Sequence, residues 1–221
     1  MLKRVLSYFV PINIYKKNST LSKTIEVTWS NGQLVLDSKN TNYSYGSLQR
    51  ILRKGLVFIG FDRVKSMEHV LILGVAGGSV IKTLIEEVKY KGKITGVELD
   101  PEIVEIGRNY FNLDKVPNLD LVIDDAFDFV LKTRDKYDLI IVDVFQDTHM
   151  PQFLFQKFFI DRLCFLLHGG GLILFNTMIL KNEENERNRR FLQILDSNNY
   201  KTTAIPRVEQ HNEVIIIEKL N

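Results

Sequence analysis

The stretch from Val70 to Asp100 constrains the fold of this chain more than any other. An apolar run at residues 70–73 leads into a turn of small residues. A segment with helical spacing follows, and a second apolar run ends at Glu98. This order of strand, Gly-rich turn, helix and strand predicts one βαβ unit. Its turn and the end of its second strand should lie side by side at the carboxyl edge of a parallel sheet, where open α/β sheets bind ligands. Since a carboxylate there can accept both hydroxyls of a ribose, the pattern predicts a nucleoside-binding crevice.

Strand and helix patterns continue to alternate after this unit. The segments that complete the predicted sheet are strands at 119–123, 137–142 and 172–176 and a closing antiparallel hairpin of 201–205 with 214–217. The predicted helices are residues 47–56, 80–88, 101–110, 126–133, 153–167, which the three glycines 169–171 should end, and 183–195. We therefore predict an α/β fold, a doubly wound Rossmann-like sheet of seven strands with an antiparallel last strand.

A smaller unit should precede this sheet. Alternating runs at 24–29 and 33–37 flank Asn31-Gly32, the strongest short-range signal for a β-hairpin. Residues 2–10 have helical spacing of apolar side chains and could pack on the body or on a second subunit, whereas the polar residues 39–45 are expected to form a loop. We predict an N-terminal segment and hairpin subdomain at 1–45 and a nucleoside-binding domain at 46–221.

Composition excludes several classes of protein. The formal net charge of +2 over 221 residues gives no reason to expect a nucleic-acid partner. No apolar run reaches the length of a membrane span, and the basic, apolar start is too short and is interrupted by Pro11. A single cysteine, Cys164, rules out an internal disulfide, and the four histidines lack metal-ligand spacing. We expect a cytoplasmic protein with no membrane contact and no metal.

Carboxylates recur where the predicted strands end. Glu98, Asp125, Asp143 and Asp147 lie at or just after successive strand ends, on the ligand edge. Each one alone is equally consistent with an ordinary cap of the following helix. Asp143 follows an apolar run, so partial desolvation should raise the pKa of its carboxyl and make it a suitable proton acceptor for an amine.

The turn itself carries less information. Gly74, Ala76, Gly77 and Gly78 would let a ligand approach the backbone, but they also fit a plain tight turn between strand and helix. As a dinucleotide fingerprint the turn fails, because Ala76 and Ser79 stand where glycines are needed. This makes a nicotinamide-dependent dehydrogenase a poor interpretation.

Several segments together resemble the spermidine synthase family. These are VLILGVAGGSV, GVELDPEIVEIGRNYF, VIDDAFDF, YDLIIVDVFQD with MPQFLFQKFF, GGGLILFN, and the upstream hairpin with NYSYGSL. The similarity covers roughly residues 24–219 and keeps the motif order. It implies a core of the class I S-adenosylmethionine methyltransferase type. The family enzymes move an aminopropyl group from decarboxylated S-adenosylmethionine to putrescine.

The resemblance implies roles for individual residues. Glu98 matches the acid that binds the ribose, and Asp125 with Ala126 matches the pair on the adenine side. Asp143 matches the aspartate that accepts the proton of the attacking amine, and Tyr45 the tyrosine that orients amine and aspartate.

Other positions match less well. Asp147 lies one residue beyond the family's second substrate aspartate, and Tyr43, a candidate substrate contact beside Tyr45, is equally explained by packing of the linker. The family turn reads GGGDGG, and here Gly77 replaces the aspartate that holds the amine of the aminopropyl chain. Gly46 stands where the family has a glutamine.

We therefore predict a spermidine synthase-like transferase. Its co-substrate would be S-adenosylmethionine or the decarboxylated form, and its acceptor an amine-bearing small molecule. Because Gly77 lacks the donor-selecting charge, it should not be an orthodox putrescine aminopropyltransferase, and a methyltransferase is the alternative. A non-catalytic nucleoside-binding or assembly protein is a second alternative. Relatives commonly pair, and the apolar N-terminal stretch suggests a homodimer.

Overall fold

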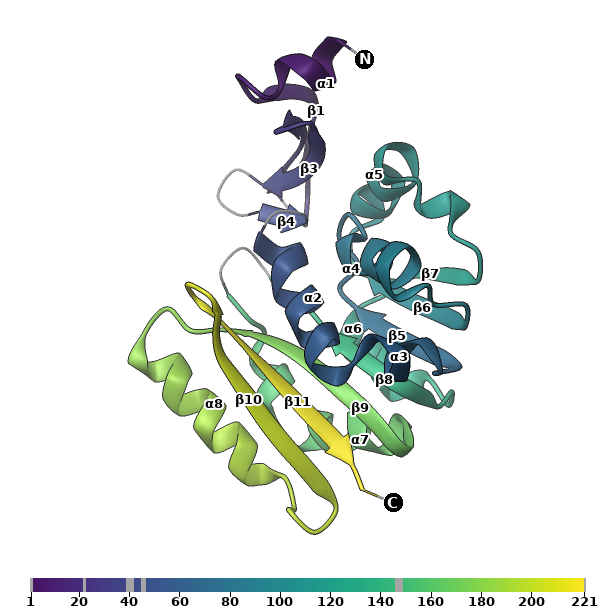
Figure 1. Cartoon of the computed structure of the whole chain (residues 1–221). Coiled ribbons are helices and arrows are strands. Elements are labelled where there is room, and N and C mark those ends of the chain that lie inside the picture. Colours follow the sequence, from purple (N-terminus) through teal and green to yellow (C-terminus); the bar gives the residue numbers. More distant parts are fainter. Residues whose placement is uncertain (1, 22, 39–41, 45–46, 146–148, 221) are drawn as a thin grey trace.

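The seven-stranded sheet that the sequence predicts forms the body of the protein (Figure 1). A computed structural model describes residues 2–21, 23–38, 42–44, 47–145 and 149–220, without the side chains of residues 23, 38, 42–44, 47 and 48. The strand order is β10-β11-β9-β8-β5-β6-β7. The strands are β5 (His69–Leu73), β6 (Lys93–Glu98), β7 (Leu119–Ile123), β8 (Tyr137–Val142), β9 (Leu167–Met178), β10 (Tyr200–Glu209) and β11 (Asn212–Lys219).

The strand directions agree with the prediction. The strands from β7 across to β9 are parallel, whereas β11 runs antiparallel to β9 and pairs with β10 in a hairpin at the sheet edge. The doubly wound fold with its antiparallel last strand is therefore confirmed, and all parallel strands end at one edge.

Helices cover both faces of this sheet. One face carries α2 (Ser47–Ile59), α3 (Phe61–Lys65) and α4 (Ser79–Thr83), and the other α6 (Ala126–Lys132), α7 (Lys157–Leu166) and α8 (Asn182–Ile194). Successive residues of a strand point to opposite faces, so Ile72 and Ile141 join the first core and Leu73 and Val142 the second. Burial on both faces explains why these strands are apolar throughout.

Two predicted helices differ in detail. The segment predicted as helix 80–88 is α4 followed by a π-helical turn, η1 (Leu84–Val88). The segment predicted as helix 153–167 begins with a 3-10 turn, η3 (Gln152–Phe155), before α7, which ends at Leu166. The glycines 169–171 do not end the helix, because β9 already runs through them. Gly170 has φ +73°, and the pairing with β8 shifts register there, so these glycines form an irregularity within a strand.

The N-terminal residues form a second, antiparallel sheet in the order β1-β2-β3-β4. Its predicted hairpin is confirmed: β2 (Lys23–Ser30) and β3 (Gln33–Ser38) meet at Asn31 and Gly32, both with positive φ. The strands β1 (Ile12–Ser19) and β4 (Asn42–Ser44) were not expected, and the loop prediction for 39–45 was wrong at residues 42–44. Most residues of β1 are polar and none is buried, so no regular apolar alternation runs through the strand.

The N-terminal sheet packs on α5 (Pro101–Phe111), beside the body. Its buried side chains, Ile25, Val27 and Leu36, meet Ile103 and Ile106 of that helix. Polar contacts add to this interface, since Lys17 pairs with Glu102 and the Ser19 hydroxyl donates to Asp100 at 2.5 Å. Asp100 also caps α5 by accepting the Glu102 N–H at 2.9 Å. The sheet is therefore tied to the segment that follows β6.

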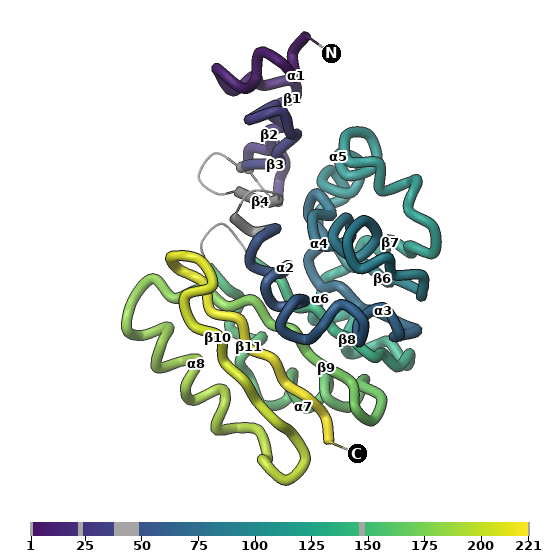
Figure 2. The backbone as a smooth tube through the Cα atoms, in the orientation of Figure 1, coloured from purple at the N-terminus to yellow at the C-terminus, as the bar shows by residue number. Residues whose placement is uncertain are grey.

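The first helix is shorter than residues 2–10 and does not pack on the body. α1 spans Leu2–Leu6, and none of its side chains is buried. Among its apolar residues Leu2 is 72% exposed, and Phe9 beyond it is 83% exposed. The N-terminus lies at the far end of the molecule from the C-terminus (Figure 2). Across the described residues, no helix has the length and apolar character needed to cross a membrane.

Candidate functional site

The candidate site lies where β5, β6 and β8 end. The Gly74 N–H donates to the Val97 carbonyl at 2.9 Å, and the Asp143 N–H donates to the Leu73 carbonyl at 2.9 Å. These two bonds hold the three strand ends together. Gly74 has φ +85°, and a Cβ there would lie 2.3 Å from the Asp143 carbonyl oxygen. Only glycine fits this close approach of two backbones.

Small residues continue the turn up to α4. Ala76 has φ +47° and Gly78 φ +76°, so each adopts the left-handed region, which is unfavourable for alanine. A Cβ on Gly78 would meet the Leu113 side chain at 2.4 Å. Gly77 between them is buried, and α4 begins at Ser79. The turn from Gly74 to Gly78 is therefore shaped mainly by its backbone.

Glu98 links this turn to the end of β6. Its Oε2 atom accepts the N–H groups of Val75 at 3.1 Å and Ala76 at 2.9 Å. Its Oε1 atom accepts those of Leu99 at 2.9 Å and Asp100 at 3.2 Å. A carboxylate offers about four lone-pair positions, so these bonds engage all of them. Any ribose hydroxyl that binds Glu98 must share or displace one of these backbone donors.

Two opposing effects act on the pKa of the Glu98 carboxyl. Burial raises its pKa, and the four backbone N–H groups, with Ala76 first, act to lower it. Burial is the larger influence, so the net direction is upward. The carboxylate is thus a desolvated acceptor fixed by the backbone, and a ligand with neighbouring hydroxyl groups would bind it in exchange for backbone donors.

Asp143 follows β8 on the other side of the turn. Its side chain is only partly exposed, and burial raises the pKa of its carboxyl to about 6. The Asn176 amide donates to its Oδ1 atom at 2.8 Å and lowers this pKa, whereas the charge of Glu98 raises it. A carboxyl with this pKa is mostly ionised near neutral pH and still basic enough to accept a proton. This agrees with the expectation from its place after an apolar strand.

Asp125 and Ala126 lie at the start of α6, beyond β7. The Asp125 carboxylate accepts the Phe127 N–H at 2.7 Å, so it caps that helix. Ala126, the first helical residue, is buried. The neighbouring Asp124 N–H donates to the Glu98 carbonyl at 3.2 Å, which brings this helix start next to the ribose candidate. A role on the adenine side of a nucleoside remains a prediction for both residues.

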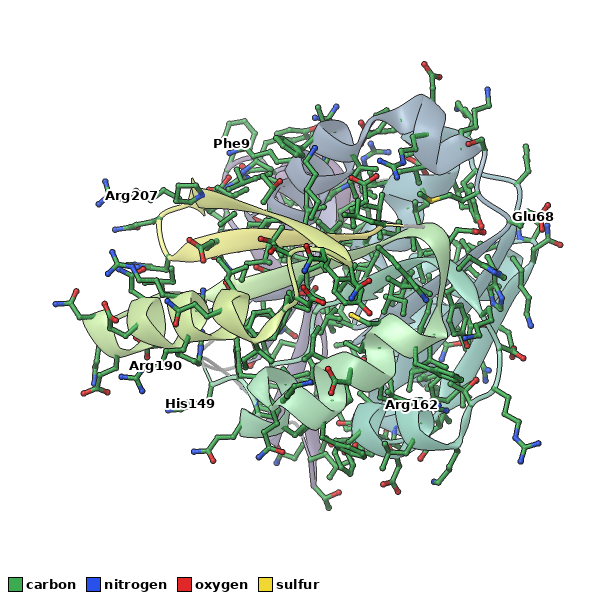
Figure 3. All side chains as sticks on the ribbon, turned by 90° about the horizontal axis from the view of Figure 1, so that it is seen from below. Phe9, Glu68, His149, Arg162, Arg190 and Arg207 are labelled. Atoms are coloured by element: carbon green, nitrogen blue, oxygen red, sulfur yellow. The ribbon has the colours of Figure 1, made fainter. Side chains whose placement is uncertain are left out.

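Three predicted contacts are not placed by the structure. Tyr45 and Asp147 lie outside the described residues, as does Gly46. Tyr43 belongs to β4, of which only the backbone is described. His149, which follows the Asp147 segment, is exposed and lies on the opposite side of the molecule from Glu68, which precedes β5 (Figure 3).

Asn176 is a site residue that the sequence analysis did not identify. It lies on β9, has no exposed surface, and contacts Asp143 directly. The available signal was a single amide directly after the apolar residues 172–175, at the same sheet edge as the predicted acids. An uncharged side chain in that position does not by itself suggest chemistry.

The site thus combines a backbone-lined turn, a desolvated carboxylate that faces it, and a second carboxyl whose pKa is raised to about 6. The first two features suit a nucleoside with vicinal hydroxyls. The third suits the removal of a proton from a neighbouring nucleophile. Among the described residues, no group of acids, histidines or cysteines is arranged to hold a metal ion.

The sequence of this chain matches a known protein family and several curated relatives. Residues 50–221 match the family model described as the spermine/spermidine synthase domain. The polyamine aminopropyltransferase of Vibrio vulnificus (strain CMCP6) is 30% identical over 113 residues, which cover 50% of this chain and 38% of the relative. That of Bacillus subtilis (strain 168) is 30% identical over 115 residues, which cover 50% of the chain and 41% of the relative. The matches therefore span less than half the length of these curated relatives.

Solved structures agree on the fold. The spermidine synthase of Thermotoga maritima superposes with a TM-score of 0.70 at 16% identity and covers 95% of this chain and 73% of that chain. Human methyltransferase-like protein 13, solved in complex with SAH, gives a TM-score of 0.65 at 18% identity and covers 80% of this chain and 83% of that chain. At these identities the likeness establishes the architecture alone, which is shared by aminopropyltransferases and methyltransferases.

Proposed function

Because the chain belongs to the spermine/spermidine synthase family, we propose that it is a transferase. It would bind S-adenosylmethionine or its decarboxylated form and transfer an alkyl group to an amine-bearing small molecule. The observation that carries this proposal is the placement of Asp143 beside the Gly-rich turn, with a carboxyl pKa of about 6. In this proposal the reacting end of the nucleoside faces the end of β8, where Asp143 would accept the proton.

The chemistry required of the protein is limited. A neutral amine attacks the carbon next to a sulfonium, the nitrogen–carbon bond forms, and the carbon–sulfur bond breaks to release a neutral thioether. The amine then carries a proton that must be removed, and Asp143 is the proposed acceptor. The remaining contribution is to hold the two reactants in line, which Tyr45 is proposed to assist from outside the described residues.

The nucleoside would be held mainly by Glu98 and the turn. Glu98 is desolvated, and its carboxylate lies within 2.9–3.1 Å of the turn nitrogens of Ala76 and Val75. We propose that ribose hydroxyls replace one of these donors on the same oxygen, while Asp125 and Ala126 contact the adenine side. The close backbone approach at Gly74 supports this placement, because it keeps side chains out of the turn.

The identity of the transferred group depends on Gly77. We propose that this position does not discriminate against the carboxylate of S-adenosylmethionine, because glycine carries no negative charge. In the family's GGGDGG turn, the corresponding aspartate would hold the amine of the decarboxylated donor and repel that carboxylate. Methyl transfer is therefore the second candidate reaction, and Gly77 is the observation that favours it.

Calorimetry with the two donors tests the proposal. We expect S-adenosylmethionine to bind at least as tightly as its decarboxylated form, and mass spectrometry of amine acceptors to identify the group transferred. A strong preference for the decarboxylated donor would contradict the interpretation of Gly77. Failure of both donors and of S-adenosylhomocysteine to bind would contradict the transferase proposal as a whole.

We also propose that the chain forms a homodimer and that its nucleoside-binding domain begins near residue 46. Support for the dimer comes from the exposed apolar residues at the tip of the N-terminal sheet, among them Leu2 and Phe9. Light scattering of the full chain and of a Phe9→Ser variant measures the assembly, and a monomeric native chain would exclude the dimer.

A further inference from the structure

Two buried side-chain amides, Asn176 and Asn212, form a chain of hydrogen bonds that ends at Asp143. Asn176 on β9 has no exposed surface, and Asn212, the first residue of β11, is 9% exposed. The Asn212 Nδ2 atom donates to the Asn176 Oδ1 atom at 3.0 Å, and the Asn176 Nδ2 atom donates to the Asp143 Oδ1 atom at 2.8 Å. The last strand of the sheet is therefore connected to the end of β8 through a continuous chain of hydrogen bonds.

The direction of this chain follows from what each group can donate. An ionised carboxylate only accepts hydrogen bonds, so Asn176 must present its NH₂ group to Asp143. Its carbonyl oxygen then points toward Asn212, which supplies a donor. If the Asn176 amide rotated by half a turn, its oxygen would face the carboxylate and its NH₂ group would face that of Asn212. Both contacts would be repulsive, so Asp143 and Asn212 together hold Asn176 in the observed orientation.

We infer that Asn176 and Asn212 are positioning residues that hold the Asp143 carboxylate by its Oδ1 atom and direct its Oδ2 atom toward the acceptor amine. The inference rests on the proposed role of Asp143 as the proton acceptor. Among the described residues, no hydrogen bond to Asp143 Oδ2 is present, so this oxygen is available for the proton. A side chain with one oxygen anchored loses little further freedom when the amine binds.

The same contact also adjusts the basicity of Asp143. A donor to the ionised form lowers the pKa of a carboxyl, and the Asn176 amide does so against the larger effect of burial. Glu98, at the end of β6, is the charged group among the described residues that acts on Asp143, and it raises the pKa. Without the Asn176 amide, burial and the charge of Glu98 would remain, and both raise the pKa, so Asp143 would stay protonated to higher pH.

A neighbouring pair of buried groups provides a matched control. Asn188 on α8 is 1% exposed, and its Nδ2 atom donates to the Thr177 hydroxyl at 2.8 Å and to the Glu213 carboxylate at 2.9 Å. Thr177 and Glu213 directly follow Asn176 and Asn212 in the chain. The Asn188 network therefore joins the same two strands with the same type of amide, but it has no contact with Asp143.

The test is a pH titration of Asp143 in the protein without ligands. The chemical shifts of ¹³C-labelled aspartate carboxyl groups, measured by NMR, report its protonation. Asp143→Asn assigns the signal. We expect Asn176→Leu to raise the pKa of Asp143 by about one unit, a tenfold change in proton affinity. Asn212→Leu should raise it by less. The double variant should resemble Asn176→Leu alone, because Asn212 acts only through Asn176. The control, Asn188→Leu, should not move it.

Two outcomes would overturn the inference. One is an unchanged Asp143 pKa in Asn212→Leu, and the other is an equal shift in Asn188→Leu, which would indicate a general loosening of the sheet. If Asn176→Leu does not fold, Asn212→Ala gives the answer, because it removes the donor at the more exposed position and adds no bulk. In that variant, affinity for S-adenosylhomocysteine should be unchanged.

These results are separable from the proposed function. The titration needs neither donor nor acceptor, so it reports on the positioning of Asp143 whether or not transfer is found. If Asp143→Asn retained full transfer activity, the role of Asp143 as the proton acceptor would fail while the hydrogen-bond chain still stood. If Asp143→Asn lost activity and Asn212→Ala did not move the titration, the positioning inference alone would fail.

Discussion

The Glu98 carboxylate accepts the Ala76 N–H at 2.9 Å, although Ala76 has the left-handed φ of +47°. The acid at the end of β6 thus compensates for an unfavourable backbone conformation in the turn after β5. An alanine in this region costs about 1–2 kcal/mol relative to the right-handed region. The ligand-binding candidate and the shape of the turn are therefore one structural unit.

Glu98→Gln should disturb this unit without changing its size. The glutamine can present its oxygen to only one pair of backbone N–H groups, and its NH₂ group would face the other pair. We expect the free energy of unfolding to fall by about 1–3 kcal/mol, together with a loss of affinity for S-adenosylhomocysteine. Urea unfolding and calorimetry measure the two effects. Glu102→Gln, at the start of α5, is the control and should keep the ligand affinity.

Two neighbouring substitutions in the turn should have opposite effects. Gly74→Ala places a Cβ 2.3 Å from the Asp143 carbonyl oxygen at φ +85°, so we expect a loss of about 2 kcal/mol or more in unfolding free energy. Ala76→Gly relieves the unfavourable left-handed conformation of an alanine but makes the unfolded chain more flexible. We therefore expect the free energy of unfolding to stay the same or to increase by up to about 1 kcal/mol. Equal losses in both variants would show that the turn is not held as described.

Much of this architecture was predictable because its signals are local. The strand at residues 137–142 was located with its bounds, since a strand covered on both faces must be apolar throughout. β1 was missed because it is mostly polar and is stabilised by its ladder with β2. The three glycines 169–171 were misread as a helix stop, because only pairing with β8 distinguishes an irregular strand from a C-cap.

The site was predictable only in part. The strand-end rule predicted that Glu98 and Asp143 lie at the same edge of the sheet, and the parallel strands β6, β5 and β8 confirm this placement. The rule did not show that the Asp125 carboxylate also caps α6, and the roles of all three acids in ligand binding stay predictions. Asn176 was missed because a contact between two side chains 33 residues apart depends on the pairing of β8 with β9.

Activity should depend on the ionisation of Asp143. Burial raises its pKa to about 6, so transfer should increase as pH rises through that value and the proton acceptor becomes charged. Asp143→Asn should reduce kcat by about 10²–10⁴-fold and leave donor affinity unchanged. Asp120→Asn, an exposed aspartate on β7, is the control. A pH profile that is flat between pH 5 and 8 in the native protein would contradict this role.

Asp37 should make stability depend on pH. It lies opposite Glu26 in the N-terminal sheet, and burial, with a smaller effect of Glu26, raises the pKa of its carboxyl to about 6. Because the folded-state pKa is the higher one, its favourable contribution is present below about pH 4 and is lost as pH rises through about 6.

Asp37→Asn should therefore raise the free energy of unfolding at pH 8 by about 1–2 kcal/mol and have little effect at pH 4. Urea unfolding at both pH values measures the difference. Asp114→Asn, an exposed residue outside this sheet, should show no such pH dependence. A stabilisation of the same size at pH 4 would point to a cause other than the buried charge.

Donor choice should respond to a single charge at residue 77. Gly77→Asp introduces, at a buried position, the acid that the resemblance implies for the family turn. At about 4 Å and an effective dielectric constant near 20, a pair of unit charges interacts by up to about 4 kcal/mol before solvent losses. We expect at least a tenfold shift in relative affinity, about 1.4 kcal/mol, toward decarboxylated S-adenosylmethionine.

Gly77→Asn is the matched control, because it adds the same volume without the charge. Comparing the two variants separates charge from crowding in the turn, and calorimetry with both donors supplies the ratio of affinities. If the ratio were the same in Gly77→Asp and Gly77→Asn, the charge at this position would not select the donor. The native glycine would then carry no information about whether methyl or aminopropyl is transferred, and the acceptor side around Asp143 would have to make that distinction.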